Sequence, residues 1–471
     1  MKRFRCCSAR LFSMIFRLAA LVTLGMVLCF PAWKGVWTGY VAIAMGASLY
    51  VCFTRTIPRW TPSLLRLQEG FYIAILIVLP TVIQLSLIFA FRSKPSLDGL
   101  FVYREALTLL ETGRMNPLTY YPPAQIWYYA LFFKLFGASP LVAQLCQIPL
   151  MAMVPMLVYL IGRDTCSLAA ARWAGIGTAF YPGLLFYVLT TPYYFSLYAV
   201  CMLLMVWSWL RMQTKAHFWI PALAGGVAAG CGALAKAVLL IAPAQTLLFM
   251  ILTAGTLRRW RLWLAWGAFV FAMMATISPW VLRNQRVFGN LIPVATSGPL
   301  VFYSANNPVS NGLYCSLPDE KSVTTPAEML AHGKYCRQQA WEFIRGHPRN
   351  FARLIWLKWL HTWGTETTFV ELININGQPL GKWHQALRAT MLTGWATLAI
   401  AWGVTAIMSI CRRLPPTPLE TAVGIIVLSK FVIYALYEGG ARHHLPGVPL
   451  LILLVFFMPN LLHHRQAGAS S

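Results

Sequence analysis

The sequence predicts an all-α polytopic membrane protein with about twelve transmembrane helices and two long extracytoplasmic loops that carry juxtamembrane helices. Of its 471 residues, 58% are hydrophobic and only 11% are charged, whereas a soluble domain carries about 25% charged residues. Apolar stretches long enough to cross about 30 Å of hydrocarbon recur along the chain. The net charge of +25 would suggest nucleic acid binding in a soluble protein, but the basic residues lie between the apolar stretches. Membrane topology therefore explains the charge, and we expect no nucleic acid partner.

Each expected span is an apolar stretch of roughly 17–24 residues. In chain order the spans cover residues 11–30, 36–53, 71–91, 140–161, 173–190, 192–210, 217–233, 237–254, 262–280, 388–411, 419–437 and 445–462. The first stretch does not fit a cleaved signal peptide, because it is too long and no small-residue cleavage site follows it.

The short connections between spans predict the orientation, because cytoplasmic connections carry the excess of Lys and Arg. With the N-terminus inside, the short inner connections hold 17 Lys and Arg residues, among them Arg55, Arg59, Arg66, Arg258, Arg259, Arg261, Arg412 and Arg413. The short outer connections hold only Lys34, Lys236 and Arg442. We therefore expect both termini in the cytoplasm and the long loops 92–139 and 281–387 outside.

The two outer loops contain helical patterns of their own. Residues 334–363 have apolar residues at helical spacing with basic residues between them, which is typical of helices that lie on a membrane surface. Residues 122–137 begin with Pro, end with Gly and are interrupted by Lys134. This segment is therefore predicted to be a surface helix rather than a span.

Asp98 is the carboxylate best placed for chemistry, because it follows the third span at the membrane–water boundary. Partial desolvation there tends to raise a carboxyl pKa toward that of a useful general base. Alternatively, Asp98 is the N-cap of the helix that residues 100–113 form, with Gly113 as its C-terminal stop. Position alone leaves both roles open. Glu105, seven residues further along this helix, is the next candidate base.

Basic residues from three different spans lie at the same outer level. Lys236, Arg283 and Arg442 would together suit a lipid-linked phosphate, although each alone could be an interface residue that extends its charge toward water. Lys430 lies about two turns inside a span, where an ammonium usually faces a cavity or a partner. His443 and His444 are ambiguous between interface anchors and polar cavity residues.

Cys315 and Cys336 share the larger outer loop, where an oxidising compartment would let them form a disulfide; two unrelated free thiols are the alternative. The sequence contains no GxxxxGK[ST], GxGxxG, HExxH or paired CxxC motif. No spacing of metal ligands stands out, so a dedicated metal site is not predicted.

Several short motifs follow one another along the chain. They are Asp98, a YPP-helix-FKLFG segment (121–137), RDTCSLAAARWAG (163–175), ALAK (233–236), PWVLRNQRVFGN (279–290), SANNP (304–308), FIRGHPRNFARL (343–354) and ARHHLPGVPLLIL (441–453). In this order and at these span positions, they together resemble the GT-C class of membrane glycosyltransferases. Within that class the chain is similar to the bacterial relatives of protein O-mannosyltransferases and of the lipid A aminoarabinose transferase.

The resemblance implies transfer of a sugar from a polyprenyl-phosphate donor to a lipid, glycan or protein acceptor at the outer face of the plasma (inner) membrane, with inversion. Asp98 falls at the family's catalytic carboxylate, and Lys236, Arg283 and Arg442 fall at its donor-phosphate or cavity residues. The cofactor is unknown, and a divalent cation at the donor phosphate stays open. Further expected cavity residues are Glu105, Tyr121, Asn306, Asn307, His443 and His444. The matched domain is 63–462, preceded by an extra span pair (1–62) and followed by a cytoplasmic tail (463–471).

Two other functional classes compete with this interpretation. A transporter or lipid flippase would have inverted repeats and broken spans that meet at the bilayer midplane, but no repeat is found. A polymerase or ligase of surface polysaccharide would use a different arrangement of outer-loop Arg and His residues. The position of Asp98 before the first long loop favours the glycosyltransferase.

Overall fold

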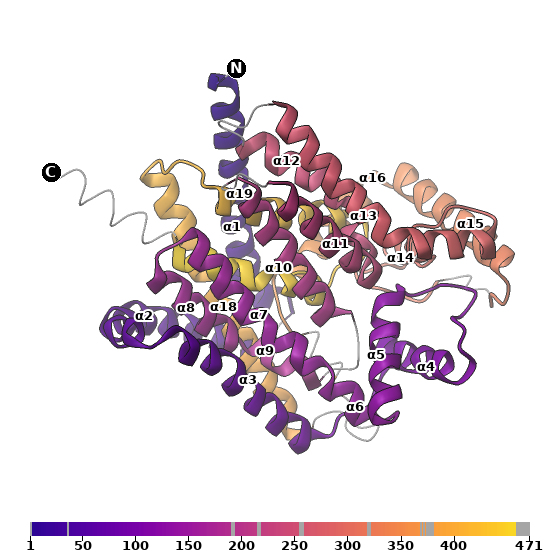
Figure 1. Ribbon diagram of the computed structural model, residues 1–471, viewed down its shortest axis with the longest axis horizontal. Helices are drawn as coiled ribbons and strands as arrows, with labels where there is room; N and C mark the ends of the chain where they lie inside the picture. The colour runs from indigo at the N-terminus through magenta and orange to yellow at the C-terminus, as the bar shows by residue number, and fades with distance from the viewer. Residues whose placement is uncertain are drawn as a thin grey trace.

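The computed structural model describes residues 2–34, 37–189, 194–213, 218–253, 259–317, 322–367, 370, 373 and 381–457. These residues are mostly helical, and none of them is in a β-strand, which confirms the all-α fold class (Figure 1). In chain order the α-helices are α1 (Lys2–Lys34), α2 (Trp37–Arg66), α3 (Glu69–Phe91), α4 (Leu97–Thr112), α5 (Pro123–Phe136), α6 (Pro140–Leu145), α7 (Gln147–Thr165), α8 (Leu168–Ala179), α9 (Pro182–Phe186), α10 (Phe195–Met212), α11 (Trp219–Ala235), α12 (Ala242–Thr253), α13 (Arg259–Phe288), α14 (Gly298–Ser304), α15 (Pro326–Gly346), α16 (Pro348–Trp363), α18 (Lys382–Cys411) and α19 (Pro418–Leu436). The short 3₁₀ helices are η1 (Tyr187–Leu189), η2 (Ala237–Ile241), η3 (Ala441–His443) and η4 (Leu445–Gly447), and a last helix covers 448–457.

The helices that could span a membrane agree with most of the expected spans, but the number twelve is not confirmed. Among the described residues, eight helices are long and apolar enough to cross a bilayer, and three shorter apolar helices accompany them. The expected span 173–190 is wrong as a single helix, because α8 ends at Ala179 and α9 begins at Pro182. Tyr181 between them has an extended backbone, as a residue that precedes proline prefers.

The helix α11 packs unusually closely against both α10 and α13. A Cβ atom at Gly226 would lie 2.2 Å from the Phe269 carbonyl oxygen, and one at Gly225 would lie 2.3 Å from Ser208 Oγ. Small residues permit such close backbone approach between apolar helices. These contacts hold α11 against its two neighbours, and Lys236 directly follows the end of this helix.

The N-terminal pair of helices packs against the C-terminal part of the chain. Helices α1 and α2 both contact α18, and α1 also contacts α19. Arg17 donates through Nε and Nη2 to the two carboxylate oxygens of Glu420 at 2.7 and 3.0 Å, and the Ser13 hydroxyl donates to the same carboxylate at 2.9 Å. Both charged side chains are buried, so the pair joins the first helix to α19 inside the bundle.

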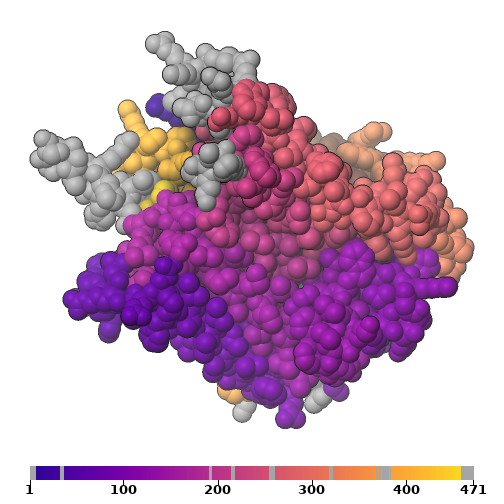
Figure 2. Space-filling view, viewed as in Figure 1, coloured from indigo at the N-terminus to yellow at the C-terminus, as the bar shows by residue number. Residues whose placement is uncertain are grey.

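The two long loops lie together at one side of the molecule. The Thr296 amide donates to the Thr119 carbonyl at 3.0 Å, and the Thr296 hydroxyl donates to the Leu118 carbonyl at 2.9 Å. Figure 1 shows α4 and α5 beside α14 and α15, and Figure 2 shows the same segments forming one continuous surface. The expected helices in 122–137 and 334–363 are α5, and α15 with α16.

Candidate functional site

Asp98 belongs to the first turn of α4, but it does not cap this helix. The N-cap residue is Ser96, and Gly113 ends the helix with a left-handed backbone. The Asp98 carboxylate instead accepts the Tyr121 hydroxyl on Oδ1 and the Arg442 guanidinium on Oδ2, each at 3.1 Å. The capping alternative is therefore wrong for this side chain, whose oxygens are directed toward a cluster of polar groups.

Arg442 connects two carboxylates from distant parts of the chain. Its Nη1 donates to Asp98, while its Nη2 donates to Glu438 Oε1. His443 Nε2 lies 3.5 Å from the same Glu438 oxygen, and its ring stacks on Tyr434 with a 4.0 Å centroid separation. Burial alone would raise the pKa of the Glu438 carboxyl, but Arg442 and His443 outweigh it and bring the pKa well below its usual range. Glu438 therefore remains an anion that holds Arg442 in place.

The exposures of the two carboxylates differ in a way that divides their roles. The Asp98 side chain is 37% exposed, whereas Glu438 is 8% exposed. An incoming reactant can thus reach Asp98 but not Glu438.

Lys236 adds a second cation near this cluster. It follows α11 with an extended backbone, and its ammonium lies 3.6 Å from the centroid of the Tyr194 ring. Burial lowers the pKa of the Lys236 ammonium well below its ordinary value, and the charge of Arg442 lowers it further. Within the described part of the chain no carboxylate forms an ion pair with Lys236. An anionic ligand would therefore be the natural partner of this ammonium.

Tyr121 keeps Asp98 in the role of an acceptor. Burial raises the pKa of the Tyr121 hydroxyl well above its usual value, and the Asp98 charge raises it further. The phenol stays protonated and donates to the carboxylate, and its ring stacks on Phe101 at 6.2 Å. The resulting site combines one accessible carboxylate with two cations, which is the equipment for taking a proton and for binding an anion.

Arg283, expected at the donor phosphate, instead fastens the first loop to α13. Its guanidinium donates to the Thr119 hydroxyl and to the carbonyls of Met115 and Asn116, at 3.3 and 2.9 Å for the carbonyls. It also lies over the Trp280 ring. These partners use both terminal nitrogens, so Arg283 holds the loop at Thr119, two residues before Tyr121.

Three further expected cavity residues are also structural. Asn306 is fully buried and joins the Phe302 and Leu436 carbonyls, each at 2.7 Å. Asn307 donates to the carbonyls of Tyr303 and Ser304. Glu105 accepts the Asn116 side-chain amide at 2.8 Å. The expectation that these three line the cavity is therefore not supported, since each is engaged within its own loop or at a helix end.

The two neighbouring histidines face different carboxylates. His443 faces Glu438, whereas His444 Nε2 lies 3.4 Å from Glu366 Oε1 in the interior. The His444 ring stacks on Trp395 at 4.2 Å, and Glu366 also accepts the Tyr181 hydroxyl at 2.6 Å. His444 and Glu366 are both fully buried and form a separate pair, whereas His443, which is also buried, lies beside Glu438 and Arg442. Glu366 and Glu438 were not predicted as site residues; the partners of Glu366, Tyr181 and His444, are distant from it in sequence, whereas Glu438 lies one turn before Arg442.

The expected disulfide is not formed. Cys315 is a free thiol, and its Sγ donates to the Ser304 carbonyl at 3.0 Å. Cys336 Sγ lies 3.6 Å from His332 Nε2, one turn away on α15. The two sulfurs thus have separate partners. An oxidising compartment alone does not pair two thiols that the fold keeps apart.

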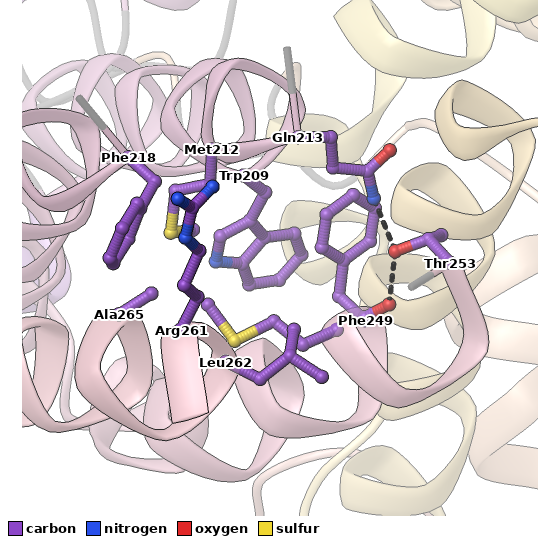
Figure 3. A pocket seen from close by; sticks show the side chains of 10 residues that line it. Trp209, Met212, Gln213, Phe218, Phe249, Thr253, Arg261, Leu262 and Ala265 are labelled. Carbon is purple, nitrogen blue, oxygen red and sulfur yellow. Dashed lines mark hydrogen bonds between the residues drawn. The ribbon is translucent and has the colours of Figure 1, made fainter. Parts of the chain in front are cut away.

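Two pockets in the described part of the chain lie apart from Asp98, Lys236 and Arg442, none of which lines them. A pocket of about 310 Å³, shown in Figure 3, is lined mainly by apolar and aromatic side chains of α10, α12 and α13, with Arg261 and the bonded Gln213–Thr253 pair as its polar groups. Arg261 lies 22 residues before Arg283 on α13, about 33 Å along the helix at 1.5 Å per residue. A smaller pocket contains Lys430, whose ammonium donates to the His443 carbonyl at 2.7 Å. No group of three or more metal-ligating side chains occurs among the described residues.

Comparisons with known proteins agree with this architecture. A family model described as dolichyl-phosphate-mannose-protein mannosyltransferase matches residues 121–282, and no curated protein sequence matches. The structure is similar to the Archaeoglobus fulgidus oligosaccharyltransferase tethered with an acceptor peptide, with a TM-score of 0.50 and 13% identity over 83% of this chain and 49% of that chain. ArnT from Cupriavidus metallidurans bound to undecaprenyl phosphate has a TM-score of 0.43 and 14% identity over 86% of this chain and 80% of that chain. The chain thus spans about half the length of the archaeal enzyme, and the likeness concerns the fold.

Proposed function

We propose that this chain is a GT-C membrane glycosyltransferase that transfers a sugar from a polyprenyl-phosphate donor to a hydroxyl acceptor at the outer face of the membrane; the matched mannosyltransferase family model and the shared fold support this proposal. One observation carries this proposal, namely the bond between Asp98 and Arg442. It joins the first outer loop to the start of the last apolar segment, 344 residues away. A proton acceptor and an anion-binding cation thereby meet at one place.

In the proposed reaction the acceptor oxygen attacks the anomeric carbon of the donor sugar. The bond from that carbon to the phosphate oxygen breaks, and its electron pair leaves with the polyprenyl phosphate. Asp98 takes the proton of the acceptor hydroxyl as the new bond forms. Attack from the side opposite the leaving phosphate inverts the anomeric centre. One carboxylate is sufficient, because phosphate leaves without being protonated.

The two cations would act on the phosphate. In the described state Arg442 divides its donors between Asp98 and Glu438. A phosphate that accepts from Arg442 and Lys236 would weaken the hold of Arg442 on Asp98 and would leave this carboxylate available to the acceptor. Charge that develops on the leaving oxygen would then be stabilised by donors already in position.

The donor can be identified in cells that lack the gene. Loss of the transferase should cause a polyprenyl-phosphate sugar to accumulate, and mass spectrometry of the lipid extract would reveal its sugar. Restoring the wild-type gene should return the pool to its starting level, whereas the D98N variant should not. An unchanged pool of every polyprenyl-phosphate sugar in the deleted cells would contradict the proposed function.

A further inference from the structure

The outer helices α15 and α16 each present a row of basic and aromatic side chains to the outside. Residues three or four positions apart lie on the same face of a helix. On α15 this spacing places four exposed side chains in one row, and on α16 it places three in another. We call the two rows together the basic row. Its members are Lys334, Arg337, Trp341 and Arg345 on α15, and Arg349, Arg353 and Trp356 on α16.

The second half of α16 lies beside the end of a membrane span. Trp359 Nε1 donates to the Phe431 carbonyl at 2.9 Å, and Lys358 Nζ donates to the Leu436 carbonyl at 3.3 Å. Phe431 is five residues, or about 8 Å, inside the end of α19. Trp356 comes one turn before Trp359, so it lies near the level at which this span ends. Trp and Arg side chains are characteristic of that interfacial level.

The positive charge of the basic row is not neutralised by the acids of the same helices. Glu328 is engaged in the capping box of Thr325 at the start of α15. Glu342 accepts the side-chain amides of Gln338 and Gln339. In the described ranges no ion pair involves the five Lys and Arg residues of the row. The row therefore presents uncompensated cations at the membrane boundary.

We propose that the basic row of α15 and α16 binds the headgroups of anionic phospholipids in the adjacent leaflet. Guanidinium groups pair with lipid phosphates through two parallel hydrogen bonds, and Trp341 and Trp356, 43% and 46% exposed, lie among the headgroups beside them. Basic side chains at such a surface gain from the anionic lipid field. An anionic glycan would suit the cations equally, but the position of α16 against α19 favours lipid.

The test uses the full-length protein in vesicles that contain a trace of spin-labelled lipid. The ratio of motionally restricted phosphatidylglycerol to phosphatidylcholine measures the preference of the protein for the anionic lipid. The R349Q/R353Q variant should lower this ratio several-fold, with about fivefold per arginine as the upper limit. High salt should also lower the ratio measured for the wild type, because salt screens the attraction between the cations and the anionic headgroups. Thermal unfolding of each variant verifies that it is folded.

The matched control is R104Q/R114Q, which removes two exposed arginines from the other outer loop. This control should retain the wild-type lipid preference. Equal effects of the two double variants, or no effect of either, would overturn the proposal. It would also be overturned if R349Q/R353Q lost turnover at unchanged lipid preference, because the row would then bind the acceptor.

Discussion

At the scale of single residues, the site depends on how one arginine is shared. Glu438 is an acid with no sequence signal of its own, yet it lies one turn before Arg442 and fixes its position. Asp98 is the more exposed partner, and it alone can meet an acceptor. A buried carboxylate that orients a cation and an accessible one that takes a proton are thus separated by environment rather than by residue type.

Lys236 predicts a pH dependence of donor binding. Burial depresses the pKa of this ammonium, and an anionic phosphate beside it would raise the pKa again, so binding should be accompanied by proton uptake. Donor affinity should therefore fall as the pH rises and the ammonium loses its proton. The K236R variant, whose guanidinium stays charged, should bind without this slope, whereas K236M should bind weakly at every pH. Titration of a donor analogue at several pH values is the measurement, and an equal slope in wild type and K236R would refute the interpretation.

At the scale of helices, two buried interactions position α19. Lys358 contacts the last residues of this helix, and the pair of Arg17 and Glu420 joins it to α1. Lys358 is fully buried and donates to Asn306 and to the Ala435 and Leu436 carbonyls at the end of α19. A cation at this end of a helix also complements the helix dipole. Lys358 and Asn306 therefore fix the helix end that Glu438 follows.

Lys358 also predicts how stability changes with pH. Burial lowers its pKa to about 7, whereas the unfolded chain holds the proton up to about 10. The unfolded state then binds more protons across that window, so the free energy of unfolding should rise with pH between about 7 and about 10. Thermal unfolding of K358M in detergent should show a smaller rise than the wild type. A rise of the same size in both proteins would mean that other groups cause it.

The pair of Arg17 and Glu420 predicts how firmly α1 is joined to α19. Removing one partner leaves a buried charge without compensation, at a cost of about 3–5 kcal/mol. R17M and E420M should each lower the thermal midpoint markedly, while the double change R17M/E420M should cost less than the sum of the two single changes. Comparison with a substitution at the exposed Arg10 controls for charge loss alone. Additive effects of the two single changes would show that the residues do not interact.

At the scale of the whole molecule, the sequence predicted the fold class well, because the length of an apolar stretch is a local signal. The helix after Asp98, the surface helix α5 and the pair α15–α16 were likewise evident from local spacing. The interruption at Tyr181–Pro182 was missed, since hydrophobicity is continuous across it. The site was predicted only in part.

What the sequence could not supply was the pairing of side chains across long chain distances. Asp98 and Arg442 were both candidates, but their contact depends on the packing of the first loop against the last segment. Arg283 has a side chain that often binds phosphate, but its guanidinium donates to carbonyl groups of the first loop. Only the folded loop reveals these hydrogen bonds. Likewise, Cys315 and Cys336 belong to the same loop, but their sulfur atoms contact different groups.

The most direct test of the central claim is the turnover of the D98N variant in a reconstituted assay with the donor lipid found in cells. Asparagine retains an oxygen that can accept from Tyr121, but it cannot take the acceptor proton. Turnover should fall by about 10²–10⁴-fold, while donor binding remains within a few-fold of wild type and the exposed E111Q control on the same helix remains active. Near-normal turnover by folded D98N would contradict the account, because the pair of Asp98 and Arg442 would then be only a structural link.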